Sequence, residues 1–445
     1  MSHTPRYDVE DRPPIGIWVS LSFQHVFAMF GATILVPLLT GLDPAIALFS
    51  SGIGTLLYIM VTQAKVPAYL GSSFAFIPSI IAVSAAFGIE YALGAGFVVG
   101  LFYVAVAGII RAFGRSWLDH ILPPVVIGAI IMVIGLNLAP VAMNMSMYPY
   151  ADPELGYQWH FFLTAAVTLG IGIICSIFLK GFFTVVPVLI AIIGGYLFAL
   201  VFGFAFPELA LIDLSSVAEA SWFGLPEFTS PRFGLIPIIT FLLVSLATIA
   251  EHLGDTLVMG TVAGRDFYKE PGVHRTLVGD GIATSVASLF GGPPNTTYGE
   301  NIGVMAISRV YSVPVIGGAA VIAVVLSFFS KFGALIQTIP GPVMGGISTM
   351  LFGIIASAGI RTVVESGVDY AHKRNLVLTS IILVIGIGGG RLFLPLPFLE
   401  GVDFDLSGVA LATLVGIIAN LLIPHDVIDP EDEDEHILTP EQRRL

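Results

Sequence analysis

The sequence has little charge and almost no cysteine. Only 11% of its 445 residues are charged, whereas soluble domains carry roughly 25%. The single cysteine, Cys175, excludes an internal disulfide bond and a cysteine metal cluster. No H-E-x-x-H or G-x-S-x-G motif occurs in the apolar segments. We therefore expect no enzyme active site, no metal and no cofactor, and we expect no nucleic-acid partner.

Apolar residues make up 56% of the chain and occur in long runs. A helix needs ~20 such residues to cross the hydrocarbon layer of a bilayer. The pattern predicts an all-α polytopic membrane protein surrounded by lipid, without a cleavable signal peptide because the first 14 residues are polar. Fourteen spans are predicted, at 15–40, 44–64, 67–87, 91–112, 117–140, 160–180, 184–206, 233–257, 274–291, 295–310, 313–330, 340–362, 374–391 and 405–424.

The basic residues predict the orientation of these spans. If the N-terminal tail (1–14) is cytoplasmic, only Arg232, Lys331 and Arg391 of the 18 basic residues fall on the outer side. Such a bias towards the inside is typical of membrane proteins. We expect a multi-pass protein of the cytoplasmic membrane with both termini inside, ending in a solvated acidic tail at 425–445.

Two segments resemble each other. Pro124–Gly128 is followed by Gly135, and Pro342–Gly346 is followed by Gly353, with eleven residues from proline to glycine in both cases. They are the fifth span of each half of seven, so the halves would enter the membrane in opposite directions. This predicts a 7+7 inverted repeat, which is common in secondary transporters, although glycine and proline are frequent enough in membrane helices for chance to produce the match.

The third and tenth segments are predicted to be broken helices. Pro67–Phe76 and Gly291–Glu300 each open with helix-breaking residues and continue with a short apolar stretch. Extended backbone at membrane depth occurs only where it is buried in protein or lines a cavity. A matching pair of broken segments indicates a midplane binding site; the alternative is that Gly291–Asn295 is an external loop.

Four carboxylates fall within the predicted spans. Glu251 and Asp255 are four residues apart and share a helix face, where at least one of them would be protonated or paired with a cation. Asp280 lies in the ninth segment, and Glu300 begins the tenth half-helix. Ionisable groups in membranes are usually functional; the alternatives are a helix cap for Glu300 and structural hydrogen bonds for Glu251 and Asp255.

The remaining polar residues suggest a ligand class without fixing it. His25 is a candidate for proton coupling, or else makes a helix–helix hydrogen bond. Carboxylates, backbone amides and an aromatic ring from Phe74 or Tyr298 would suit a flat, neutral, polar ring. Two acids would suit a cation equally well.

Four stretches carry a resemblance to a known family. They are Gln24–Thr33, Pro67–Phe76, Ala250–His252 and Pro294–Ile307. The sequence resembles the nucleobase–cation symporter-2 (nucleobase–ascorbate transporter) family, and within it the uracil type. The resemblance implies a core domain (15–112 and 233–330), a gate domain (117–206 and 340–424), proton coupling, an elevator mechanism and a homodimer formed through the gate domain.

The resemblance also implies roles for individual residues. Glu251 and Glu300 would hydrogen-bond the base. Phe74, Gly299, Tyr298 and Ser73 would complete the substrate site, and Asp255, Glu251, Asp280 and His25 would serve proton coupling. Asp255 departs from the uracil type, in which a histidine is expected, and is similar to the xanthine and urate carriers. The expected function is proton-coupled uracil uptake; the alternatives are a xanthine or purine symporter and, from another class, an anion exchanger or channel of the same fold.

Overall fold

The computed structural model describes residues 5–394 and 404–424. Among these residues, eight helices are long and apolar enough to cross a membrane. They are α1 (Ile15–Thr40), α2 (Pro44–Val61), α4 (Ile89–Phe113), the continuous pair α6 (Pro124–Asn137) and α7 (Ala139–Met147), α8 (Trp159–Phe178), α9 (Pro187–Ala205), α11 (Leu235–Ala263) and α16 (Gly341–Glu365). The protein is therefore a multi-pass helical membrane protein, as predicted.

The predicted number of fourteen spans and the 7+7 repeat are not confirmed. Several predicted spans are helices of 10 to 17 residues, shorter than a bilayer crossing. These are α3 (Ile77–Phe87), α12 (Val273–Leu289), α13 (Gly299–Ser308), α14 (Val313–Ser327), α17 (Lys373–Ile387) and α18 (Gly408–Leu422). A ninth span results if α14 is joined to α15 (Ser330–Gln337), although the two are bent by 84°.

The fifth predicted span, 117–140, is interrupted. A short helix α5 (Ser116–Ile121) ends at Leu122, which has a non-helical backbone with φ −122° and ψ 69°. Two prolines follow, and the residue before a proline is disfavoured in the helical region. The apolar composition of 117–140 did not indicate this break, because Pro124 is well accommodated as the first residue of α6.

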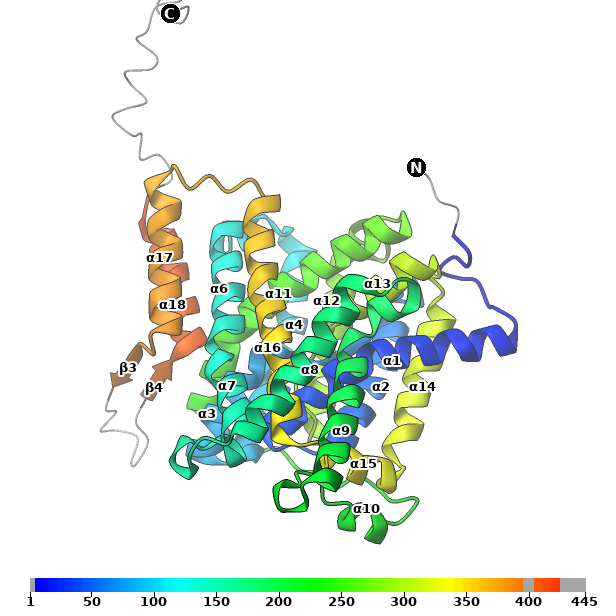
Figure 1. The fold of residues 1–445 in the computed structure, drawn as a ribbon. Coiled ribbons are helices and arrows are strands. Elements are labelled where there is room, and N and C mark those ends of the chain that lie inside the picture. Colours follow the sequence, from blue (N-terminus) through cyan, green and yellow to red (C-terminus); the bar gives the residue numbers. More distant parts are fainter. Residues whose placement is uncertain (1–4, 395–403, 425–445) are drawn as a thin grey trace, which may run out of the picture. The chain divides into compact units, whose positions relative to one another are not determined.

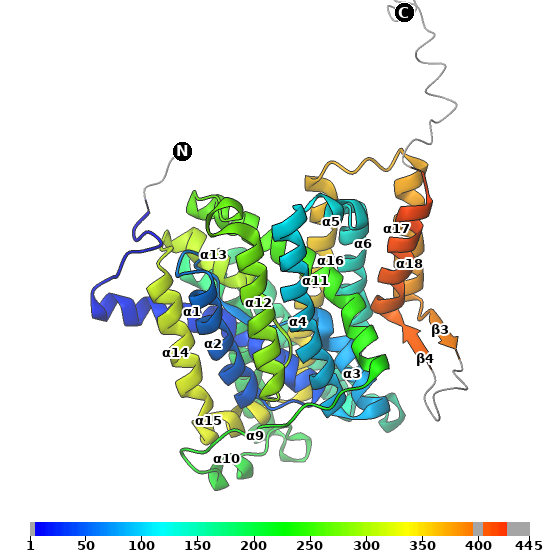
Figure 2. The same ribbon diagram turned by 180° about the vertical axis from the view of Figure 1, so that it is seen from behind.

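The chain forms two compact units, residues 1–114 with 134–354, and residues 115–133 with 355–445. In the first unit, α14, α2, α12 and α4 lie side by side (Figure 2). In the second, α17 packs against α18, and the strands β3 (Arg391–Leu394) and β4 (Phe404–Ser407) pair antiparallel at the end of these helices (Figure 1). The predicted core and gate domains stay a prediction, and the acidic tail lies outside the described residues.

Glycine permits the closest helix contact around the site. A Cβ atom on Gly100 of α4 would lie 2.2 Å from the carbonyl oxygen of Gly281 in α12, and a Cβ on Gly281 would lie 2.5 Å from the carbonyl oxygen of Gly100. Small residues at such positions let membrane helices approach through their backbones. This contact positions α12, which carries Asp280, against α4.

Candidate functional site

A pair of short strands forms the framework of the site. β1 (Leu70–Ser72) and β2 (Asn295–Thr297) pair antiparallel, with Leu70 opposite Thr297 and Ser72 opposite Asn295. The ladder is extended at one end by the Ser73 N–H, which donates to the Pro294 carbonyl oxygen at 2.9 Å. The extended stretches predicted in the third and tenth segments are confirmed. Gly291–Asn295 is buried within the protein and leads into the strand β2, which argues against its alternative interpretation as an external loop.

Neighbouring helices satisfy the polar groups of this buried strand pair. The Thr55 hydroxyl of α2 accepts from the Leu70 N–H at 2.9 Å and lies 3.2 Å from the Leu70 carbonyl oxygen. The Thr284 hydroxyl of α12 donates to the Asn295 carbonyl oxygen at 3.0 Å. Buried backbone groups need such partners, so the strand pair is tied to α2 and α12.

Each strand leads directly into a half-helix. β1 continues into a 3-10 turn (Phe74–Phe76) and α3, and β2 continues through Tyr298 into α13, which begins at Gly299. The first N–H groups of a helix have no partner within it. Because the strands are antiparallel, the two half-helices lead away in opposite directions and their N-termini begin at the same strand pair. These N-termini provide hydrogen-bond donors and positive helix ends for a ligand.

Open space lies beside the carboxylates. Gly299 and Gly254 are exposed, and a Cβ atom built on either of them would meet no atom within 4 Å. Glu251, on α11, is also exposed. An exposed carboxylate and two uncrowded glycines leave this side of α11 and α13 accessible to a ligand.

Three of the four predicted carboxylates come together here. Glu251 and Asp255 of α11 lie close enough to Glu300 of α13 for their charges to interact. The hydroxyl of Thr297 donates to Oδ2 of Asp255 at 2.8 Å. α1, α2, α3, α11 and α13 and the strand pair contain no lysine or arginine, so these elements place no permanently charged cation beside the three acids.

The fourth carboxylate, Asp280 of α12, is fully buried, and its charge also acts on Glu251 and Asp255. Its Oδ2 atom lies 3.1 Å from Nδ1 of His252, and both side chains are fully buried. The ring of Tyr58 lies edge-on to that of His252, with centroids 6.4 Å apart. Asp280 therefore contacts a histidine on the buried side of α11, while Glu251 faces the open side.

His25 makes the helix–helix hydrogen bond that was the alternative to proton coupling. Its Nδ1 atom lies 3.0 Å from Nδ2 of Asn301, which also donates to the His25 carbonyl oxygen at 3.2 Å. Both side chains are buried. The contact joins α1 to α13 one residue after Glu300, and a role of His25 in proton coupling stays a prediction.

The other predicted substrate residues differ in their surroundings. Tyr298 is 3% exposed, and its hydroxyl donates to the Ser72 carbonyl oxygen at 3.2 Å and accepts from Thr33. Ser73 is fully buried, whereas Phe74 is partly exposed. Gly299 and Phe74 thus lie at the open side, and Tyr298 and Ser73 within the wall.

Sequence reasoning did not identify two contacts of the site. It did not connect Thr297 with Asp255, or His252 with Asp280. Spacing along one helix cannot reveal a partner on another element. The only available signals were the hydroxyl in the broken segment and a histidine next to Glu251.

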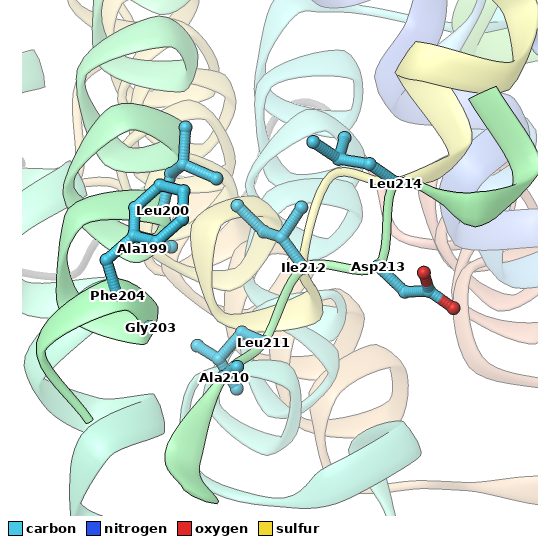
Figure 3. Close-up of a pocket in the computed structure, with 9 residues that line it drawn as sticks. All are labelled: Ala199, Leu200, Gly203, Phe204, Ala210, Leu211, Ile212, Asp213 and Leu214. Carbon is cyan, nitrogen blue, oxygen red and sulfur yellow. The ribbon is translucent and has the colours of Figure 1, made fainter. Parts of the chain in front are cut away.

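A cavity of about 510 Å³ lies elsewhere, beside the C-terminal end of α9 (Figure 3). Its walls are the last two turns of α9, including Phe204, and the segment Ala210–Leu214. Asp213 is the only charged residue among them, and its carboxylate accepts from the N–H and hydroxyl of Ser215 at the start of α10 (Ser215–Glu219). The cavity contains none of the predicted site residues.

The fold and site define a class of protein. Apolar helices with two broken segments, in which paired extended strands lead into half-helices and carboxylates lie nearby, are typical of secondary transporters. The profile described as "Permease family" matches residues 16–394.

The sequence is similar to proteins of the same length. It is 51% identical to the uracil permease of Bacillus subtilis (strain 168), over 96% of this chain and 97% of that protein. It is 42% identical to the uracil permease of Escherichia coli (strain K12), over 96% and 97%. The chain belongs to this permease family, the nucleobase–cation symporter-2 family, and is a permease and not an enzyme.

Solved structures share the fold at low sequence identity. SLC26A9 superposes with a TM-score of 0.67 at 10% identity, over 92% of this chain and 65% of that chain. The transmembrane domain of the cyanobacterial bicarbonate transporter BicA superposes with a TM-score of 0.62 at 17% identity, over 93% and 99%. At these identities the likeness concerns the fold alone.

Proposed function

We propose that this protein is a secondary active transporter that carries uracil together with protons across the cytoplasmic membrane. The relatives named as uracil permeases support the substrate class, since they cover nearly the whole chain. The observation that carries the proposal is that Glu300 lies in the first turn of the half-helix α13 and that Glu251 of α11 is close enough for the two charges to interact. This arrangement offers acceptors and donors to the same small space.

A pyrimidine base fits these groups chemically. Uracil has two ring N–H donors and two carbonyl acceptors in one plane. Glu251 and Glu300 would accept from the N–H groups, and the backbone N–H groups of Phe74 and Gly299 would donate to the carbonyls. Charge-assisted hydrogen bonds of this kind are about twice as strong as neutral ones.

Substitution of Glu300 by glutamine tests this arrangement. The amide replaces a carboxylate acceptor at nearly constant volume, so we expect binding of uracil to weaken on the order of 10- to 100-fold. Binding is measured as thermal stabilisation of the purified protein by uracil, because a ligand of the folded state raises its melting temperature. Glu219→Gln, at an exposed position of α10, is the matched control.

Two results would contradict these assignments. If Glu300→Gln protein is folded and uracil stabilises it as much as the wild type, Glu300 does not bind the base. Absence of stabilisation in the wild type by any nucleobase would contradict the proposed function itself.

Xanthine or another purine is the alternative substrate, favoured by Asp255. Uptake of labelled uracil into proteoliposomes, in competition with xanthine and thymine, separates the two. Stronger competition by xanthine than by unlabelled uracil would reassign the substrate.

An anion as substrate fits the site poorly. SLC26A9 is described as an anion transporter, but the elements of this site contain three neighbouring carboxylates and no lysine or arginine. Anion sites need positive charge or helix N-termini free of acids. Chloride or bicarbonate should therefore neither stabilise the protein nor compete with uracil.

The proposal includes the orientation and assembly expected from the sequence. Both termini would be cytoplasmic, the core and gate domains would move as in an elevator, the gate domain would form a homodimer, and no cofactor beyond the proton would be needed. Mass measurement of the protein in detergent or nanodiscs checks the dimer.

A further inference from the structure

Asp255 accepts one hydrogen bond from a side chain in the described part of the chain, and its donor is the hydroxyl of Thr297. Thr297 is 2% exposed and Asp255 is partly exposed. Their 2.8 Å contact joins α11 to β2. It connects a carboxylate expected to exchange protons with the strand that leads into Gly299 and Glu300.

Thr297 is held firmly from its other side. It lies opposite Leu70 in the strand pair, and Leu70 is tied to Thr55 of α2. The next N–H along the chain, of Tyr298, donates to the Tyr69 carbonyl oxygen at 3.0 Å. The hydroxyl therefore reaches Asp255 from a fixed backbone, and Asp255 is the partner that can adjust.

The Thr297 hydroxyl binds the ionised form of the Asp255 carboxyl group more strongly than the protonated form. A threonine hydroxyl donates to an ionised carboxylate in a charge-assisted bond, which is stronger than its bond to the neutral acid. The groups that also act on Asp255 are Glu251 and His252 on its own helix, Tyr58 on α2, Asp280 on α12 and Glu300 on α13. Tyr103 of α4, which faces α11, is hydrogen-bonded to Thr248.

We propose that Thr297 is a positioning residue that holds Asp255 in place and sets the pH at which Asp255 exchanges its proton. The inference rests on the proposed function, because it gives Asp255 the proton-coupling role. It assigns to β2 a part in coupling in addition to its part in shaping the binding site.

The test is a pH titration of Asp255 without substrate. Infrared spectra of the purified protein between about pH 4 and 9 report protonated carboxyl groups, and the band lost in Asp255→Asn belongs to Asp255. Loss of one charge-assisted hydrogen bond should move the titration midpoint in Thr297→Val up by about one pH unit. Thr297→Ser keeps the hydroxyl and should titrate like the wild type.

Thr296 provides a matched control in the same strand. Its side chain is also buried, and its hydroxyl has no hydrogen-bond partner among the described residues. Thr296→Val should leave the midpoint unchanged. If Thr297→Val does not fold, Thr297→Ala gives the same comparison with a smaller side chain.

Two results would overturn the inference. One is a wild-type midpoint in Thr297→Val or Thr297→Ala; the other is an equal shift in Thr296→Val. The same variants are then assayed for the pH profile of uracil uptake, which should shift in parallel with the infrared midpoint. Because the titration uses no substrate, it can succeed or fail independently of whether the wild type transports uracil.

Discussion

At the scale of single residues, the proposed proton coupling requires that the charge of Glu251 or Asp255 can change. They lie one helical turn apart near Glu300, with no lysine or arginine on the surrounding site elements. Like charges this close repel, and a proton or a ligand N–H group relieves the repulsion. Substrate and proton binding would thus favour each other through one group of acids.

Neutralising these acids should uncouple transport from the proton gradient. We expect Asp255→Asn to flatten the dependence of uptake on external pH. We expect Glu251→Gln to flatten it as well and also to lower the affinity for uracil, since of these two residues only Glu251 is expected to contact the base. The measurement is the initial rate of uracil uptake into proteoliposomes between about pH 5 and 8, which lies above the ordinary pKa values of carboxylates. Gradient-driven accumulation that survives in the double variant would place coupling elsewhere, with Asp280 as the next candidate.

The residues of the site were predictable to different degrees. Glu251 and Asp255 could be placed on one face because a spacing of four is a property of a single helix. Glu300 could be placed at a half-helix start from the broken segment before it. The Asp255–Thr297 and His252–Asp280 contacts depend on strand register and helix packing, which spacing along one element does not contain.

At the scale of elements, composition predicted the broken segments but not the number of spans. Pro67–Phe76 and Gly291–Glu300 are rich in helix breakers, and both fold as strand followed by half-helix. By contrast, an apolar run gives no sign of a bend between α14 and α15, or of the break at Leu122. Apolar composition predicts burial in lipid or protein, and the length of each helix depends on its caps and neighbours.

The α4–α12 contact should be sensitive to a single methyl group. In Gly100→Ala the new Cβ would lie 2.2 Å from the Gly281 carbonyl oxygen, so the helices must separate. We expect a loss of about 1–3 kcal/mol in the free energy of unfolding, measured by denaturation in detergent. Gly108→Ala is the control on the same helix, because its Cβ would meet no atom within 4 Å.

Gly100→Ala should lower the free energy of unfolding, whereas Gly108→Ala should not. Alanine is a better helix former than glycine by about 1 kcal/mol, so Gly108→Ala should be neutral or stabilising. If Gly100→Ala is as stable as Gly108→Ala, the close approach of the two helices contributes nothing to stability.

At the scale of the whole molecule, the N-terminal segment connects distant parts of the first unit. The Tyr311 N–H donates to the Tyr7 carbonyl oxygen at 2.8 Å, and the Val313 N–H donates to the Val9 carbonyl oxygen at 2.9 Å. Val9 is fully buried. Residues 6–11 therefore pack along the connection between α13 and α14, which no sequence pattern had indicated because the segment is polar.

Arg265, just after α11, holds this segment by two ion pairs. Its guanidinium lies 2.8 Å from Oδ2 of Asp8 and 2.6 Å from Oε1 of Glu10. The hydrogen bond from Arg265 lowers the pKa of Glu10. Partial burial alone would raise the pKa of Asp8, but hydrogen bonds from Arg265 and the Val9 N–H outweigh it and lower that pKa as well. The N-terminal segment thereby joins the C-terminal end of α11 to the C-terminal end of α13. These two helices carry the site carboxylates.

Replacing Arg265 by glutamine should release this segment in a pH-dependent way. A carboxylate whose pKa is lowered on folding stabilises the protein above its unfolded pKa, and the effect is lost as the pH falls through the folded value. The unperturbed values are 3.8 for Asp8 and 4.5 for Glu10. We therefore expect Arg265→Gln to reduce the free energy of unfolding near neutral pH by about 1 kcal/mol or less, since the groups are largely exposed, and this reduction to shrink as the pH falls below these unperturbed values.

Hydrogen exchange of the Tyr311 and Val313 amides measures the release directly. Their exchange should be faster in Arg265→Gln than in the wild type at neutral pH and low salt, and the difference should shrink at about 1 M salt, where charges are screened within about 3 Å. Lys269→Gln is the control, because the Lys269 side chain is 87% exposed and its ion pair is local, with Asp266 three residues away. Equal protection of both amides in wild type and Arg265→Gln would mean that the backbone hydrogen bonds and buried Val9 hold the segment without the ion pairs. Faster exchange that extends to the Asn301 side of α13 would show that the segment also stabilises the half-helix carrying Glu300.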